Sequence, residues 1–162
     1  MQAYPWLVFF HLLGAFGFVF AHGSSAFISF RLRRERNVDR IAAMLELTNL
    51  SAGLMYPSLA ILLIAGILAG LAGRWFSQGW IWVALALLIV ITVAMFAIAT
   101  PYYNRLRRLA GLPGRDRRRA VPARASEAEI ATALQSRRPE VLALIGTVGL
   151  ILLIWLMVLK PF

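Results

Sequence analysis

Two histidines are the side chains of this 162-residue sequence best suited to hold a metal or a haem. His11 and His22 are its only histidines. Eleven helical residues return to within about 20° of the same direction, so both side chains lie on one helix face, roughly 16 Å apart along the axis. Neutral imidazole binds haem iron and copper. The alternative is that each histidine is hydrogen-bonded to a carbonyl or hydroxyl group of a neighbouring helix.

The face that carries the histidines has the spacing of a packed helix seam. Steps of four and three residues connect His11, Ala15, Phe18, His22, Ser25 and Ser29. This alternation predicts a face turned toward neighbouring helices. The two serines make one end of the seam polar, although their hydroxyls can also bond to the carbonyl one turn earlier.

A second seam offers donors that could complete a site. It contains, with the same spacing, Met44, Thr48, Ser51, Met55 and Ser58. Thioether with imidazole suits haem iron or Cu(I), whereas a methionine stripe is equally compatible with packing. No cysteine and no third histidine is present, so a haem would need His with Met, Tyr or an open position. We therefore take His11, His22, Met55 and Tyr56 as cofactor candidates, and the two histidines as metal candidates.

The candidate residues lie in apolar segments long enough to cross a bilayer. Hydrophobic residues make up 60% of the chain. We expect an all-α protein with four transmembrane helices at about residues 6–30, 50–72, 80–100 and 139–159, the third ending at Pro101. A cleaved signal peptide is the alternative for the first segment, but no basic residue precedes it.

The cations lie between the apolar segments. Fifteen of the seventeen Lys and Arg residues fall in the connections 31–49 and 101–138, which places these loops in the cytoplasm and both termini outside. Ser126 and Glu129 have capping-box spacing, so a short amphipathic helix is expected to run to about Gln135 before the last span. This pattern predicts a multi-pass protein of a bacterial inner membrane. The arginines expected at its anionic inner leaflet are Arg31, Arg33, Arg34, Arg117, Arg118 and Arg119.

Composition also narrows the function. The basic loops lack the interleaved aromatic residues that stack on bases, so nucleic acid is not expected as a partner. No acidic or basic residue lies deep in a span, which argues against a proton-coupled transporter. No serine-histidine-aspartate set or phosphate-binding loop is present, so soluble-type catalysis is not indicated.

Small residues indicate how the helices associate. Gly66 and Gly70 form a GxxxG motif, and Gly14 and Gly17 give the first span a small-residue face. We expect these glycines to pack the spans of one chain against each other. A homodimer seam is the alternative.

Short motifs in three of the spans resemble a known group of proteins. They are His11-Leu12-Leu13-Gly14-Ala15, Ile64-Ala65-Gly66-Ile67-Leu68 and Met157-Val158-Leu159-Lys160-Pro161. The chain is similar to small bacterial four-helix integral membrane proteins of unknown function, which are allied to the copper-resistance D family and distantly to the small membrane protoporphyrinogen oxidases. The resemblance implies a helical bundle in which His11 contacts haem or metal. The oxidases' fuller set of polar intramembrane residues is missing here.

Three functions remain open from the sequence. The first is a membrane subunit that packs with partner helices and holds a haem or metal through His11 and His22. The second is a structural accessory subunit of a larger energy-transducing or photosynthetic complex, without a cofactor. The third is a small haem-dependent oxidase or copper-handling protein.

Overall fold

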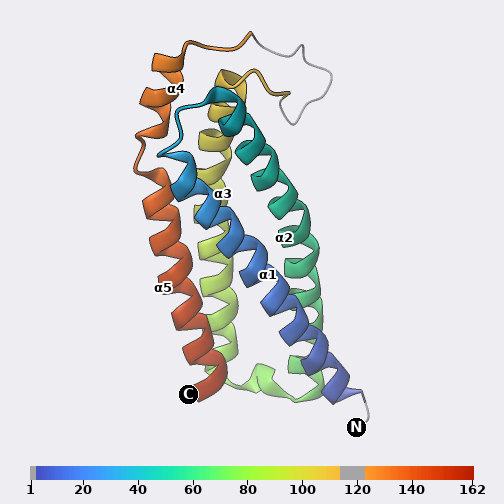
Figure 1. The fold of residues 1–162 in the computed structure, drawn as a ribbon. Coiled ribbons are helices and arrows are strands. Elements are labelled where there is room, and N and C mark those ends of the chain that lie inside the picture. Colours follow the sequence, from blue (N-terminus) through green and yellow to red (C-terminus); the bar gives the residue numbers. More distant parts are fainter. Residues whose placement is uncertain (1–2, 114–122) are drawn as a thin grey trace.

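The protein is an all-α bundle with four long helices, as the sequence predicts (Figure 1). The computed structural model describes residues 3–113 and 123–162. The elements are α1 (Tyr4–Leu32), α2 (Val38–Ala72), the 3₁₀ turn η1 (Trp75–Ser77), α3 (Gly79–Leu109), α4 (Glu127–Leu134) and α5 (Arg138–Leu159). Helices α1, α2 and α3, and the segment 127–159 that contains α5, are long and apolar enough to cross a membrane.

Helix boundaries follow local capping signals. The Asn37 side chain accepts a hydrogen bond from the backbone N–H of Arg40 and begins α2. Ser126 and Glu129 form the expected capping box, so the prediction of a short helix there is confirmed. The sequence expectation that the helix ends at Pro101 is wrong, because α3 continues to Leu109. Burial of residues beyond the proline outweighs the hydrogen bond that the proline cannot donate.

The long helices form two close pairs. Helix α1 packs along α2, and α3 packs along α5. A Cβ atom added at Gly14 would lie 2.5 Å from the Leu62 backbone nitrogen, so only glycine permits this approach of α1 to α2. In the second pair, Gly149 of α5 lies against Ile91 of α3. Between the pairs, α1 runs obliquely from the end of α2 toward the start of α5 (Figure 1).

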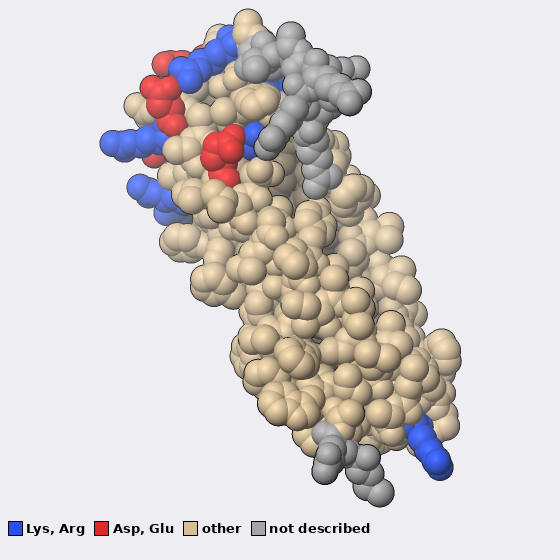
Figure 2. Space-filling model, turned by 90° about the vertical axis from the view of Figure 1, so that its right-hand side faces the viewer, with Lys and Arg blue, Asp and Glu red and all other residues tan. Residues whose placement is uncertain are grey.

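The two ends of the bundle differ in chemistry. At the end where α4 lies, which we call the charged end, acidic and basic side chains gather, while the long body is apolar (Figure 2). Its buried cluster joins all of α1 to α4 and consists of Leu32, Ile41, Leu45, Tyr102, Leu106, Ala110, Ile130, Ala133 and Leu134. At the opposite, aromatic end, Trp80, Ile81, Ala84 and Leu156 are buried together. The Lys160 ammonium lies 3.9 Å from the centre of the Trp75 ring there.

Candidate functional site

The two histidines face different neighbours of α1. Nδ1 of His11 lies 2.9 Å from the carbonyl oxygen of Leu62 on α2, so this nitrogen carries the proton and donates it. The ring rests on Gly66, where an added Cβ would stand 2.7 Å from Nδ1. His11 therefore has the neighbour-helix hydrogen bond that the sequence left as the alternative to a ligand role. The bond leaves Nε2 as the ring's acceptor.

His22 is placed differently, although it lies on the same half-buried seam of α1. Its ring stacks on Phe18 with an interplanar angle of 3°. Its Nε2 faces α5, where a Cβ added at Gly146 would be 2.7 Å away. The methyl carbon of Met95, on α3, lies 3.5 Å from that same point. His22 and Met95 thus converge on Gly146 between the two helix pairs.

The second-seam candidates are not among the atoms that meet at Gly146. Gly17 of α1 lies against the Ser58 side chain, and Met55, one turn before Ser58 on α2, is half-buried. His22 instead contacts α5. Tyr56 follows Met55 but turns outward, and 45% of its surface is exposed.

The packing glycines are used inside the chain. Gly14 and Gly17 contact α2, and Gly66 contacts His11 of α1. Gly70 lies against Phe76 of η1 and Ile81 of α3. At each of these four positions an added Cβ would stand less than 3.0 Å from a neighbouring atom, so that the neighbour would have to shift. The motif residues thus hold the spans of one chain together.

The polar end of the α1 seam connects to α3. The Ser29 hydroxyl donates to the Ser25 carbonyl at 2.7 Å and is also hydrogen-bonded to the Tyr103 hydroxyl. The Tyr102 ring lies next to that of Tyr103, with ring centres 5.1 Å apart. A line of polar groups therefore runs from His22 toward the charged end.

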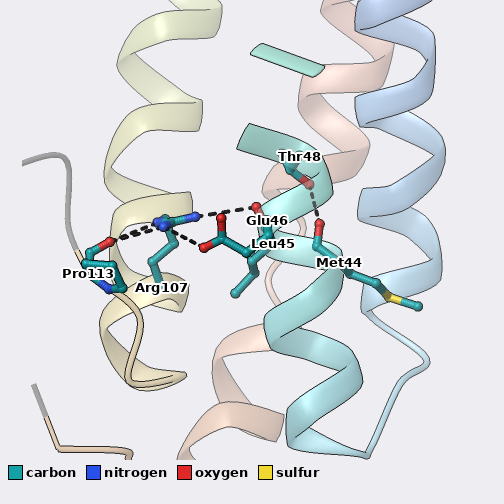
Figure 3. Close-up of polar contacts among 6 residues, drawn as sticks. All are labelled: Met44, Leu45, Glu46, Thr48, Arg107 and Pro113. Atoms are coloured by element: carbon teal, nitrogen blue, oxygen red, sulfur yellow. Dashed lines mark hydrogen bonds and ion pairs between the residues drawn. The ribbon is translucent and has the colours of Figure 1, made fainter. Parts of the chain in front are cut away.

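Arg107 ties the charged end together (Figure 3). Its guanidinium pairs with Glu46 of α2 at 2.9 Å and donates to the Pro113 carbonyl oxygen at 3.1 Å. A longer contact of 3.5 Å reaches the Leu45 carbonyl oxygen. Only 15% of the Arg107 side chain is exposed, so these bonds are partly shielded from water. One side chain thereby joins α2, α3 and the turn after α3.

The loop between α1 and α2 is organised by Glu35. Its carboxylate accepts from the backbone N–H groups of Asn37 and Arg36 at 3.1 and 2.9 Å. These two bonds stabilise the charged form and hold the pKa of Glu35 below its usual value. The chain can therefore reverse direction over only five residues, from 33 to 37.

The arginines expected at the membrane surface have different environments. Arg31 and Arg34 are exposed, whereas Arg33 is half-buried and forms an ion pair with Glu140 of α5. Arg117, Arg118 and Arg119 lie outside the described residues. Of the three that are described, Arg33 thus also serves to join α1 to α5.

Other features of the described chain give no further candidate. No group of three or more His, Asp or Glu residues suited to a metal occurs within residues 3–113 and 123–162. A hollow of about 240 Å³ lies beside α4 and is lined mainly by apolar residues, with Glu35 and Glu127 among its polar ones. It lies at the charged end, away from both histidines.

Sequence reasoning missed Met95 and Arg107. Met95 lies in a span without histidine or charged residues between residues 80 and 100, and nothing in its spacing distinguishes it from packing. Arg107 stands between Arg105 and Arg108 and differs from them only in lying on the inner face of α3. Tyr102 and Leu106 mark that face, but only in a helix that continues past Pro101.

Comparison with known proteins identifies the family. The sequence model described as "Predicted integral membrane protein (DUF2269)" matches residues 5–161. No curated protein and no solved structure matches the chain. The family match includes all four long helices and agrees with their apolar surfaces. The chain therefore belongs to the DUF2269 family of predicted integral membrane proteins.

Proposed function

We propose that this protein is a membrane subunit that holds a single soft metal ion, Cu(I), between His22 and Met95. The observation that carries the proposal is the convergence of both side chains on Gly146. Imidazole nitrogen and thioether sulfur are donors that favour Cu(I) over hard cations. An ionisable side chain inside a bilayer is costly without a partner, and a metal ion would supply one for His22.

The same geometry favours a bare ion over a haem. The His22 ring lies directly against the backbone of α5 at Gly146. A macrocycle bound to Nε2 would require α1 and α5 to separate, whereas a single ion occupies far less space. A bound Cu(I) ion would serve either copper storage or electron transfer. The chain's own residues would bind the ion and exclude water from it.

His11 has a structural role in this proposal. Its Nδ1–H donates a hydrogen bond to the Leu62 carbonyl oxygen, and its ring packs against Gly66. The resemblance to the copper-resistance D family is compatible with a copper site, although it points to His11 rather than to His22. The donor pair at Gly146 is our reason for choosing His22.

Metal analysis of the purified protein tests the proposal. Detergent-solubilised protein is loaded with copper under ascorbate, desalted and analysed for bound copper. We expect about one copper per chain, a loss of most of it in His22→Ala and Met95→Leu, and full retention in the matched controls His11→Ala and Met55→Leu. Copper binding that is absent, or that persists in His22→Ala, would refute the proposal. A Soret absorption band lost in His22→Ala would show a haem instead.

A structural accessory subunit is the second candidate. Within the most apolar stretch of each span, only 11–17% of the residues are buried inside the chain. Lipid or partner helices must therefore cover most of this surface, and partner subunits would fit a role in a larger membrane complex. The four packing glycines already serve internal contacts, so they lend no support to a homodimer. Copurification of metal-free protein with a larger assembly would favour this role.

The inner membrane of a bacterium is our proposed location, with the charged end in the cytoplasm. The support is the concentration of arginine in the two long connections. Both termini would then lie on the outer face. The DUF2269 description agrees with a membrane location without giving the direction.

A further inference from the structure

The end of α1 and the beginning of α5 bring an excess of positive charge together. Arg33 reaches Glu140 in the first turn of α5 and forms an ion pair with it. Arg137 and Arg138 are exposed at the start of the same helix. Glu140 is the only acid in that first turn, and among the described residues neither Arg137 nor Arg138 has an ion-pair partner. The only carboxylate of this turn is therefore paired with Arg33, and two further guanidinium groups beside it have no ion-pair partner within the described residues.

The helix itself makes this excess less favourable. The first turn of an α-helix carries the positive end of the helix dipole, and cations there are destabilising. The backbone N–H groups at this helix start already have partners within the chain. The Arg138 N–H donates to the Ser136 hydroxyl oxygen, and the N–H groups of Glu140 and Val141 donate to the Arg137 carbonyl oxygen. An external anion would relieve the repulsion among the side chains.

A buried hydroxyl at the same place has no partner. Tyr102 of α3 is 3% exposed, and its hydroxyl makes no hydrogen bond within the described chain. Its neighbour Tyr103 is bonded to Ser29. Tyr102 lies in the buried cluster that also contains Leu32, the residue before Arg33, and Arg33 is paired with Glu140 in the same turn of α5 as Arg138. Buried hydroxyls in proteins nearly always have a partner, which indicates that a group from outside the chain supplies it.

The location suggests which anion this is. Tyr102 stands where α3 passes from its apolar stretch into the cluster at the charged end. Arg138 precedes the apolar stretch of α5. Both therefore lie at the depth where lipid headgroups meet the hydrocarbon layer. Basic pockets between helices at this depth commonly bind anionic headgroups.

We propose that the junction of α1, α3 and α5 binds the phosphate group of an anionic phospholipid. Arg138 and Arg33 would contact the phosphate oxygens, and the Tyr102 hydroxyl would donate a hydrogen bond to them. Glu140 limits the affinity, because its carboxylate competes with the phosphate for Arg33 and repels it. The site thus differs from general attraction of arginines to a negative surface, since it depends on a neutral tyrosine and is opposed by one particular glutamate.

Lipid retention by the full-length protein tests this site. The protein is reconstituted in nanodiscs of equal phosphatidylglycerol and phosphatidylcholine, and the phosphatidylglycerol retained after transfer to detergent is measured by native mass spectrometry. Each arginine near an anionic surface contributes about 1 kcal/mol, so we expect roughly fivefold weaker retention in Arg138→Gln. Tyr102→Phe should also reduce retention, and Glu140→Gln should increase it. Arg105→Gln, with the same charge change on an exposed part of α3, is the matched control and should behave as the parent protein.

Three results would overturn the proposal. Equal losses in Arg138→Gln and Arg105→Gln would show attraction by net charge alone. Unchanged retention in Tyr102→Phe would mean that its hydroxyl is satisfied by a water molecule. Displacement of phosphatidylglycerol by millimolar inorganic phosphate would identify a free anion, not a lipid, as the occupant. Because Glu140→Gln is expected to strengthen binding, a folding defect cannot imitate its result.

Discussion

Changing Gly66 to alanine should break the contact between α1 and α2 at His11. A Cβ atom at this position would stand 2.7 Å from Nδ1 and 2.9 Å from Cε1 of the imidazole. Neither distance can be accommodated, so the ring must move. Its hydrogen bond to the Leu62 carbonyl, 2.9 Å long, would be lost with that movement.

The expected cost follows from two terms. A hydrogen bond between membrane helices contributes about 0.6 kcal/mol on average, and overpacking of a closely packed site costs about 1–3 kcal/mol. Gly53 on the same helix provides the reference, because an added Cβ there meets nothing within 4 Å. Both substitutions gain similarly in helix propensity, which cancels in the comparison. Gly66→Ala should therefore be less stable than Gly53→Ala by about 2–3 kcal/mol.

Reversible unfolding by dodecyl sulfate in mixed micelles, followed by tryptophan fluorescence, measures this difference. The same two substitutions are repeated in His11→Ala, which removes the ring that the new methyl group would strike. The difference between Gly66→Ala and Gly53→Ala should then fall to about 0.5 kcal/mol or less, since the sites no longer interact. A full difference that persists in His11→Ala would refute the packing described for this site.

Two further predictions concern the charged end. Arg107→Gln should lower the free energy of unfolding by about 2 kcal/mol, because it removes charged hydrogen bonds to Glu46 and Pro113, whereas exposed Arg108→Gln should have little effect in the same assay. Protection of the Asn37 amide from hydrogen exchange should depend on pH through Glu35. Because the folded-state pKa of Glu35 is lowered, its contribution is complete above the usual glutamate pKa and is lost as the pH falls through the lowered value. Glu35→Gln should abolish that dependence, and an unchanged profile in this variant would contradict the assignment.

Features set by neighbouring residues in the chain could be predicted from the sequence. Each span is an uninterrupted apolar segment, so four long helices follow from length and composition. The caps at Asn37 and Ser126 depend on side chains within three residues of the helix start. The seam of α1 could be identified because a helix has a fixed angle per residue.

Features set by helix crossing could not be predicted. His11 and His22 share a face of α1, but the spacing does not tell that His11 meets α2 whereas His22 meets α5. The approach of His22 and Met95 to Gly146 depends on how the helices cross. Local preference predicts a helix end at Pro101, whereas the cluster that buries Tyr102 and Leu106 favours continuation of α3. In each case, contacts distant in sequence determine the result.

The direction of the chain across the bilayer is tested most directly by labelling two single cysteines in intact cells. The chain has no cysteine of its own, so Gln78→Cys at the aromatic end and Gln135→Cys at the charged end report separately. Both positions are exposed, which makes them a matched pair. We predict that an impermeant maleimide labels Gln78→Cys in intact cells and Gln135→Cys only after permeabilisation. Labelling of Gln135→Cys alone in intact cells would invert the topology, and equal labelling of both would contradict four membrane spans.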